Sequence, residues 1–244
     1  MQTKTFNVYN HENQAVQDAY SMLAANIHLK DGERKIKSVV LTSCKPSVGK
    51  TTLAISLGIT MAQSGWKVLL VDADMRKPSE AKRLNSDEIN GLSEYLSGDV
   101  ELQDALCKTN VKNLTYFSCG KNHPNPIGLL CSARFDEMIA KARNVYDFII
   151  FDTPALATVA DGSLVAAKSD ATMLVVEIGS TNLLTLRRAK QQLEKVNANT
   201  LGVVLNKVRK RDYKEYFESY NYFFNTEKFL NMKMTGKAKI TTKL

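Results

Sequence analysis

Strand-length apolar runs alternate with helix-length amphipathic stretches along most of this 244-residue chain. The alternation predicts a mainly parallel β-sheet with helices on both faces, because parallel strands are joined by helical crossovers. Strands are expected at 37–43, 67–72, 113–117, 147–152, 171–176 and 201–206. Longer helices are expected at 51–64, 126–143, 159–168 and 182–196, and shorter ones at 91–98 and 102–107. The Val-, Ile- and Leu-rich strands are typical of a sheet buried on both faces.

The net charge of +8 is concentrated near the C-terminus, since residues 207–244 hold 10 basic and 4 acidic side chains. The remainder is nearly neutral, with 23 basic and 21 acidic side chains, which argues against a nucleic-acid-binding surface on the main fold. We expect a helical N-terminal lead at 1–36, a core at 37–208 and a flexible basic tail at 209–244, forming a single domain overall. No apolar run approaches the roughly 20 residues that span a bilayer, so we expect no membrane segment in the chain.

A phosphate-binding loop is predicted where the first core strand runs into Cys44-Lys45-Pro46-Ser47-Val48-Gly49-Lys50-Thr51-Thr52 and then into a helix. In a strand–loop–helix setting, backbone N–H groups and the positive end of the helix hold phosphates, a lysine neutralises their charge, and a Ser or Thr hydroxyl binds Mg²⁺. Cys44 takes the place of the usual first glycine. The residues expected to contact the nucleotide are Pro46, Ser47, Val48, Gly49, Lys50, Thr51 and Thr52.

Carboxylates end two further apolar strands. One strand runs into Asp72-Ala73-Asp74-Met75-Arg76, and another ends in Phe151-Asp152. Carboxylates at the carboxyl ends of parallel strands point into the crevice where ligands bind, and beside a phosphate loop they hold Mg²⁺ or act on the attacking group. The sequence therefore predicts a nucleoside triphosphate site with Mg²⁺.

The set PSVGKTT, LLVDADMRKP and IIFDTP resembles the Walker A, A′ and B motifs of the bacterial tyrosine kinases. Further segments, INGLSEYLSGDVELQDAL, NPIGLL and AKQQLEKVNANTLGVVLNKV, resemble the Gram-positive capsular-polysaccharide tyrosine autokinases of the CpsD/CapB type, so that the similarity covers nearly the whole chain. The resemblance implies a P-loop NTPase fold of the MinD/ParA-like class, unrelated to eukaryotic kinases.

The resemblance also implies roles for the motif residues in the transfer of the ATP γ-phosphoryl group to a tyrosine hydroxyl. Lys50 stabilises the phosphate charge, Thr51 and Asp152 hold Mg²⁺, and Asp72 orients the metal or its waters. Asp74 is the expected base, and Arg76 positions the acceptor or balances Asp74. Asn206, at the end of the last strand, is expected to contact adenine by analogy with related ATPases.

Four of the nine tyrosines lie within ten residues of the tail: Tyr213, Tyr216, Tyr220 and Tyr222. Three of them share one helical face with nearby phenylalanines, a stripe that is also typical of packing. The resemblance favours the other interpretation, in which these tyrosines are the phosphate acceptors, used in trans between subunits. Each phosphorylation would add roughly −1.5 to −2 charges to the basic tail.

By resemblance, the partners are a transmembrane polysaccharide co-polymerase adaptor that activates the kinase, further copies of the chain and a cognate tyrosine phosphatase. This implies a cytoplasmic protein recruited to the inner face of the membrane. Many relatives build a ring of subunits through Glu-x-x-Arg-x-x-Arg; Asp18, Ser21 and Ala24 stand at those positions here, so both arginines are missing.

Two other functions remain open at this point. Lys45 occupies the position of the signature lysine of the MinD/ParA-type ATPases, which favours a positioning ATPase without a tyrosine substrate. Pro46 and Ser47 replace the glycines expected in such enzymes, and Arg76 with the tyrosine cluster favours the kinase. A nucleotide-sensing regulator of polysaccharide assembly is the non-enzymatic alternative.

Overall fold

The computed structural model describes residues 5–9, 13–29, 36–76 and 90–208. It divides the chain into two compact units, Met1–Lys207 and Val208–Leu244, and the fold below is that of the first unit. The tail tyrosines and the basic tail at 209–244 lie outside the described residues.

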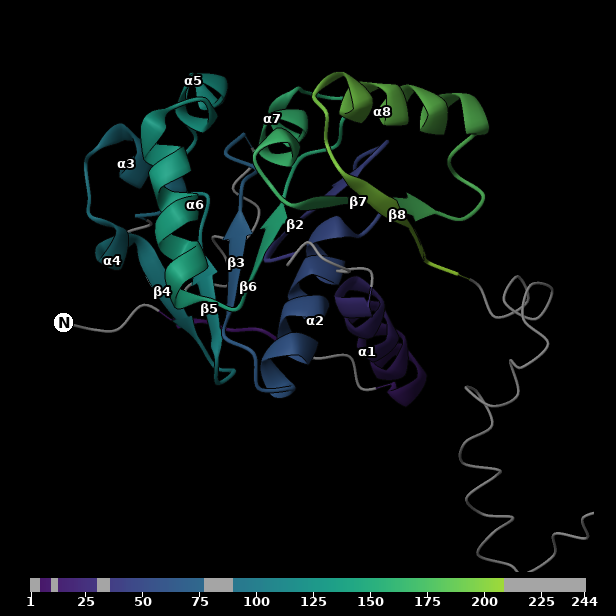
Figure 1. The fold of residues 1–244 in the computed structure, drawn as a ribbon, viewed down its shortest axis with the longest axis horizontal. Helices are drawn as coiled ribbons and strands as arrows, with labels where there is room; N and C mark the ends of the chain where they lie inside the picture. The colour runs from purple at the N-terminus through teal and green to yellow at the C-terminus, as the bar shows by residue number, and fades with distance from the viewer. Residues whose placement is uncertain (1–4, 10–12, 30–35, 77–89, 209–244) are drawn as a thin grey trace, which may run out of the picture. The chain divides into compact units, whose positions relative to one another are not determined.

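Eight strands and eight helices make up the described part of the chain (Figure 1). The strands are β1 (Thr5–Phe6), β2 (Ser38–Ser43), β3 (Val68–Asp72), β4 (Leu106–Thr109), β5 (Leu114–Phe117), β6 (Phe148–Asp152), β7 (Ala171–Glu177) and β8 (Thr200–Asn206). The helices are α1 (Gln14–Leu29), α2 (Lys50–Gln63), α3 (Leu92–Ser97), α4 (Leu102–Ala105), α5 (Pro126–Leu130), α6 (Ala133–Val145), α7 (Asp161–Ala167) and α8 (Leu183–Lys195). None of the helices in these described ranges is long and apolar enough to cross a membrane.

The strands form one sheet in the order β1-β4-β5-β3-β6-β2-β7-β8, and every neighbouring pair is parallel except β4 and β5. The central strands β3, β6 and β2 are buried along their whole length. Their carboxyl ends therefore meet at one edge of the sheet, which is where the motif residues were expected. The mainly parallel sheet predicted from the sequence is confirmed.

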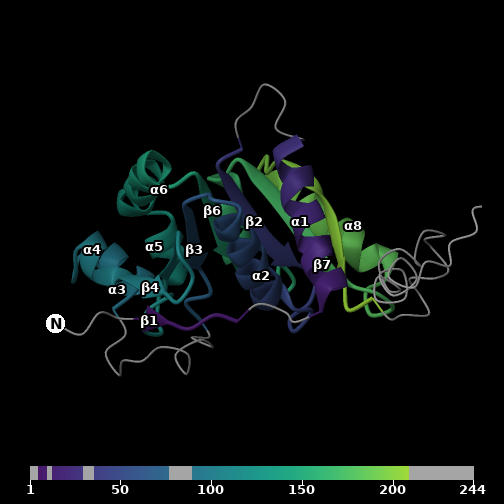
Figure 2. The ribbon, with the colours of Figure 1, turned by 90° about the horizontal axis from the view of Figure 1, so that it is seen from below.

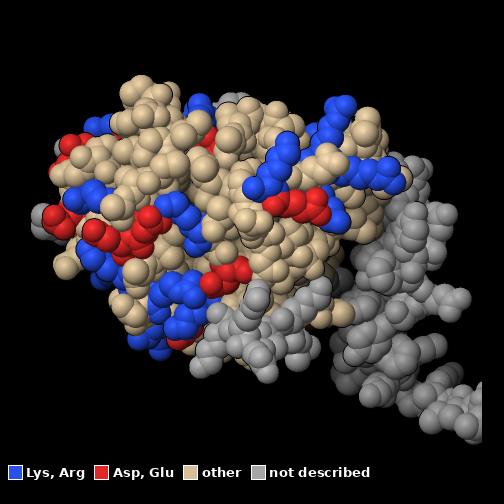
Figure 3. All heavy atoms as spheres, turned by 45° about the horizontal axis from the view of Figure 1, so that its top comes forward, with Lys and Arg blue, Asp and Glu red and all other residues tan. Residues whose placement is uncertain are grey.

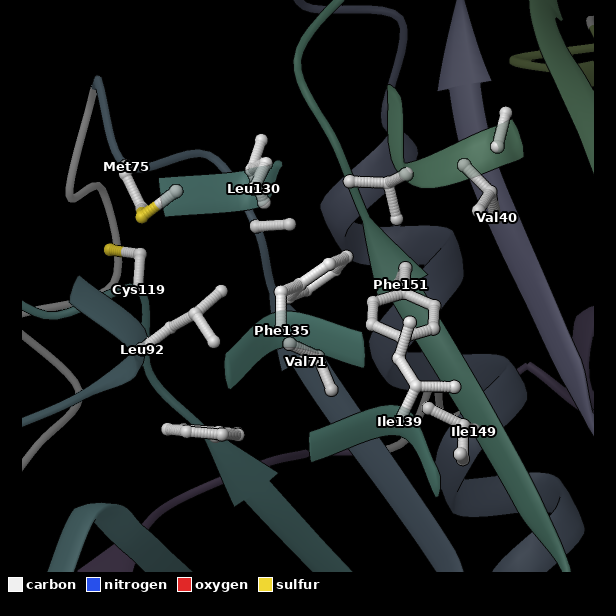
Figure 4. Close-up of a cluster of buried hydrophobic side chains, with 14 of the residues drawn as sticks. Val40, Val71, Met75, Leu92, Cys119, Leu130, Phe135, Ile139, Ile149 and Phe151 are labelled. Atoms are coloured by element: carbon white, nitrogen blue, oxygen red, sulfur yellow. The ribbon is translucent and has the colours of Figure 1, made fainter. Parts of the chain in front are cut away.

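Helices cover both faces of the sheet, as predicted. The apolar side chains of α1 and α2 pack on one face, with α1 beside α2 (Figures 1 and 2). The helices α3, α5, α6, α7 and α8 pack on the other face. There, Phe135 and Ile139 of α6 lie against Val71, Ile149 and Phe151 of the strands (Figure 4).

Six strands were predicted from the sequence, and all six are present, shifted by a residue at some ends. The single helix expected at 126–143 is wrong, because the segment folds as α5 and α6. Each of the two has its own cap: Asn125 Oδ1 accepts from Gly128 N (3.0 Å), and Ser132 Oγ accepts from Phe135 N (3.4 Å). A hydroxyl that binds the backbone in this way starts a new helix.

Three further expectations are corrected by the structure. The short helix expected at 102–107 ends at Ala105, and β4 begins at Leu106. The N-terminal lead holds the expected helix, α1, but also β1, which pairs with β4 and extends the sheet. Helix α7 begins at Asp161, two residues later than expected.

Candidate nucleotide and phosphotransfer site

The phosphate loop, residues 44–49, connects β2 to α2. Its backbone turns through left-handed conformations at Ser47 (φ 61°) and Gly49 (φ 92°). Gly49 is the N-cap of α2 and supplies no side-chain cap, so the first N–H groups of the helix are left for another acceptor. A helix start of this kind, next to a lysine at Lys50, is suited to bind phosphate.

The outer side of the phosphate loop is held by the end of β8. Asn206 Nδ2 donates to the Val48 carbonyl (2.8 Å), and Lys207 Nζ donates to the Ser47 carbonyl (2.8 Å). Lys207 also pairs with Glu177 Oε2 at 3.2 Å. Two adjacent carbonyls of the loop thus accept hydrogen bonds from residues at the end of β8. The backbone N–H groups of the loop are not used by these bonds and can bind phosphate. The sequence interpretation missed Lys207, because its partner in the phosphate loop is 160 positions away.

The carboxylates of β3 and β6 lie beside this loop. Asp72 and Asp152 are paired in the parallel register of the two strands, and Leu41 of β2 is the partner of Asp152 on the other side. Thr51 Oγ1, in the first turn of α2, donates to Asp152 Oδ2. The structure therefore brings together Thr51, Asp72 and Asp152, the three residues expected to hold Mg²⁺.

Asp72 is almost fully buried, with 4% of the residue exposed. Burial raises its pKa well above the ordinary value, and the neighbouring charges of Asp152 and Asp74 raise it further. Asp72 Oδ1 accepts from the Asp74 backbone N–H (3.0 Å), and the Tyr116 hydroxyl donates to its Oδ2 (3.4 Å). Negative charge is therefore crowded at this point, and a divalent cation would relieve the crowding.

Asp74 lies just beyond the strand, since β3 ends at Asp72. The direction of the Asp74 side chain is therefore set by the turn that follows β3 and not by the alternation of side chains along the strand. The turn is fixed by its own hydrogen bonds: Asp74 N–H to Asp72, and Arg76 N–H to Asp74 Oδ1 (3.3 Å). Asp74 thereby stays next to the paired carboxylates.

The Arg76 side chain forms an ion pair with Asp161, the first residue of α7. Its Nε donates to Asp161 Oδ2 at 2.8 Å and its Nη2 donates to Oδ1 at 3.1 Å. This hydrogen-bonded pairing raises the pKa of Arg76. The sequence interpretation missed Asp161, because its partner is 85 positions away and the segment 159–168 was assigned only to a helix.

The remaining residues of the phosphate-loop motif differ in exposure. Lys45, Pro46, Ser47 and Thr52 are exposed, whereas Val48 is buried. Lys45 Nζ donates to the Ser180 carbonyl of the same chain (2.6 Å). On the face shown in Figure 3, basic and acidic side chains are interspersed, so the described residues on that face do not form a large patch of one sign.

Comparison with known proteins agrees with this geometry. The family described as "AAA domain" matches residues 36–201. The tyrosine-protein kinase CpsD of Streptococcus pneumoniae is 40% identical over 193 residues, which cover 79% of this chain and 84% of that protein.

Solved structures are similar as well. The kinase domain of the Escherichia coli tyrosine kinase ETK superposes with a TM-score of 0.76 at 30% identity, over 80% of this chain and 76% of that one. The chimerical protein CapA2B2 gives a TM-score of 0.74 at 32% identity, over 78% and 84% of the two chains.

The fold is shared more widely than the activity. The septum site-determining protein MinD of Pyrococcus horikoshii, in complex with Mg-ADP, gives a TM-score of 0.59 at 22% identity, over 73% and 76% of the two chains. This similarity shows the P-loop fold alone, whereas the kinases match in sequence and structure together. The chain is an enzyme that belongs to the family of tyrosine-protein kinases that includes CpsD.

Proposed function

We propose that this tyrosine kinase transfers the γ-phosphoryl group of ATP to tyrosines of its own tail in trans, using Tyr213, Tyr216, Tyr220 and Tyr222 as acceptors. One observation carries the proposal: the phosphate loop, Thr51 and the paired carboxylates Asp72 and Asp152 lie together at one edge of the sheet. The tyrosine cluster in the sequence supplies an acceptor segment.

The donor set at this edge fits Mg²⁺, which prefers hydroxyl and carboxylate oxygens. Thr51, Asp72 and Asp152 would hold it, and the buried, charge-crowded Asp72 favours a cation at this point. When bound, Mg²⁺ neutralises negative charge on the β- and γ-phosphates.

Residues of the chain bind the phosphates and accept the proton of the tyrosine hydroxyl. Lys50 and the N–H groups of the phosphate loop hold the phosphates and stabilise the charge that develops on them. Asp74 accepts the proton of the attacking tyrosine hydroxyl, and the P–O bond to ADP breaks as the new P–O bond forms. Asn206, which binds the loop through Nδ2, still has its carbonyl oxygen to offer an adenine amino group.

We also propose a cellular role and cellular partners for this kinase. Similarity to CpsD and to the chimerical CapA2B2 supports a role in capsular or exopolysaccharide synthesis, with a transmembrane co-polymerase adaptor that recruits the kinase to the inner face of the membrane. A cognate phosphatase would remove the phosphates. Addition of the adaptor's cytoplasmic segment should raise the rate of tyrosine phosphorylation; equal rates with and without it would exclude activation by the adaptor.

A mixing experiment tests transfer in trans. Chain with all four tail tyrosines replaced by Phe is the donor, full-length Lys50→Met is the acceptor, and both are incubated with ATP and Mg²⁺. Phosphotyrosine should appear on the Lys50→Met chain, and only when the donor is present. Release of ADP without phosphotyrosine would instead select a positioning ATPase of the MinD/ParA type.

A further inference from the structure

Asp161 is a buried carboxylate to which the proposed chemistry assigns no task. Its side chain is 0% exposed, and both of its oxygens accept hydrogen bonds from Arg76. A fork-to-fork pair of this kind fixes the plane of the guanidinium as well as its distance. Arg76, in contrast, keeps 37% of its side chain exposed, so the guanidinium is held on one side and open on the other.

The start of α7, next to Asp161, is closely packed. A Cβ on the next residue, Gly162, would lie 3.1 Å from the Pro154 carbonyl and 3.1 Å from the hydroxyls of Thr42 and Thr153. The start of α7 is therefore pressed against the ends of β2 and β6. The Thr42 hydroxyl also donates to the Pro154 carbonyl at 3.0 Å, which ties those two strand ends together.

From this support, hydrogen bonds lead step by step to the reacting groups. Asp161 holds the Arg76 side chain, and the Arg76 N–H donates to Asp74 Oδ1 (3.3 Å). The Asp74 N–H in turn donates to Asp72 Oδ1 (3.0 Å). The turn that carries the expected base is thus fixed at one end by β3 and at the other by α7.

We propose that Asp161 is a positioning residue for phosphotransfer: it fixes the Arg76 guanidinium, and through Arg76 the turn that presents Asp74 to the incoming tyrosine. The inference rests on the proposed function, since it gives Asp161 a task in that reaction. The phosphate loop is held by other groups, Asn206 and Lys207. Loss of the Asp161–Arg76 pair should therefore reduce turnover at saturating ATP while nucleotide affinity changes little.

Four variants of the full chain test the role of Asp161: Asp161→Asn, Arg76→Gln, the double variant and Arg76→Lys. Turnover at saturating Mg–ATP is measured with the Lys50→Met chain as acceptor, and the Kd of Mg–ADP is measured separately. We expect each variant to lose tenfold or more in turnover, with Kd within about twofold of wild type. The double variant leaves no buried charge without a partner, so it tests the proposal even where a single variant fails to fold.

Asp170→Asn is the matched control. Asp170 forms a comparable pair with Arg143 (2.8 Å) at the opposite end of the sheet, so its loss should lower the melting temperature and leave turnover at the wild-type level. Wild-type turnover in the folded double variant or in Arg76→Lys would overturn the positioning role, since neither variant keeps the paired hydrogen bonds between the Arg76 guanidinium and Asp161. Phosphotyrosine and ADP are both measured. Release of ADP without phosphotyrosine by the wild type refutes the proposed function. Phosphotyrosine formation by the variants at the wild-type rate refutes the role of Asp161.

Discussion

Gly49 is the position in the phosphate loop where a single methyl group should do most harm. Its φ is +92°, and a Cβ there would lie 2.4 Å from Asn206 Nδ2, the atom that donates to the Val48 carbonyl. Gly49→Ala therefore combines backbone strain with displacement of the amide that holds the loop. The left-handed conformation costs a residue other than glycine about 1 kcal/mol or more, and loss of the Asn206 hydrogen bond adds about 1 kcal/mol.

We expect the loop of Gly49→Ala to relax by moving away from Asn206, so that nucleotide binding must first restore the wild-type geometry of the loop. The cost of about 2 kcal/mol then appears as lost affinity, on the order of 30-fold for Mg–ATP. Gly65→Ala is the matched control: Gly65 has φ +97°, and a Cβ there would have nothing within 4 Å. It should lose stability through strain alone and keep wild-type affinity.

Titration of both variants with a fluorescent ATP analogue, together with thermal melts, measures the two effects separately. Asn206→Ala should weaken binding less in the Gly49→Ala background than in the wild type, because the hydrogen bond to Val48 can be lost only once. Equal affinities for Gly49→Ala and Gly65→Ala would show that contact between the loop and Asn206 does not control nucleotide binding.

Two other predictions concern ion pairs. Lys207→Met should weaken Mg–ATP binding about fivefold, since it removes a hydrogen bond worth about 1 kcal/mol from the Ser47 carbonyl; Glu177→Gln spares that bond and should change affinity less than twofold, and equal effects in the same titration would contradict this. Burial opposes ionisation of Asp170, but hydrogen bonds from Arg143, Lys37 and Ser38 hold its pKa below the ordinary value. A lowered folded-state pKa stabilises the fold above the unfolded value of about 3.9 and ceases to do so as the pH falls through the folded-state pKa. Asp170→Asn should therefore cost about 2 kcal/mol of unfolding free energy at pH 7, and the gap from wild type should close below about pH 4 in melts recorded across pH; a gap independent of pH would refute the assignment.

The central sheet and the phosphate loop could be predicted from the sequence because their signals are local. The strand ending in Asp152 is apolar throughout and buried on both faces, and the loop lies in consecutive residues between a strand and a helix. The break between α5 and α6 was missed because Ser132 interrupts a run that otherwise reads as one amphipathic helix.

The features that were missed depend on partners remote in the sequence. Strand β1 is only two residues long, and it is defined by pairing with β4 about a hundred positions later. Asp161 and Lys207 are ordinary residues in the sequence, and only the folded chain brings them to Arg76 and to the phosphate loop. Local propensity carries no information about such contacts.

Mass-spectrometric mapping of phosphotyrosine, after incubation of the full chain with ATP and Mg²⁺, tests the central claim most directly. Wild type should carry phosphate on Tyr213, Tyr216, Tyr220 or Tyr222, while the buried Tyr95 and Tyr116 stay unmodified. Lys50→Met incubated alone should carry none. Consumption of ATP with no phosphate on any tyrosine of the tail, or equal labelling of the Lys50→Met chain, would contradict the account.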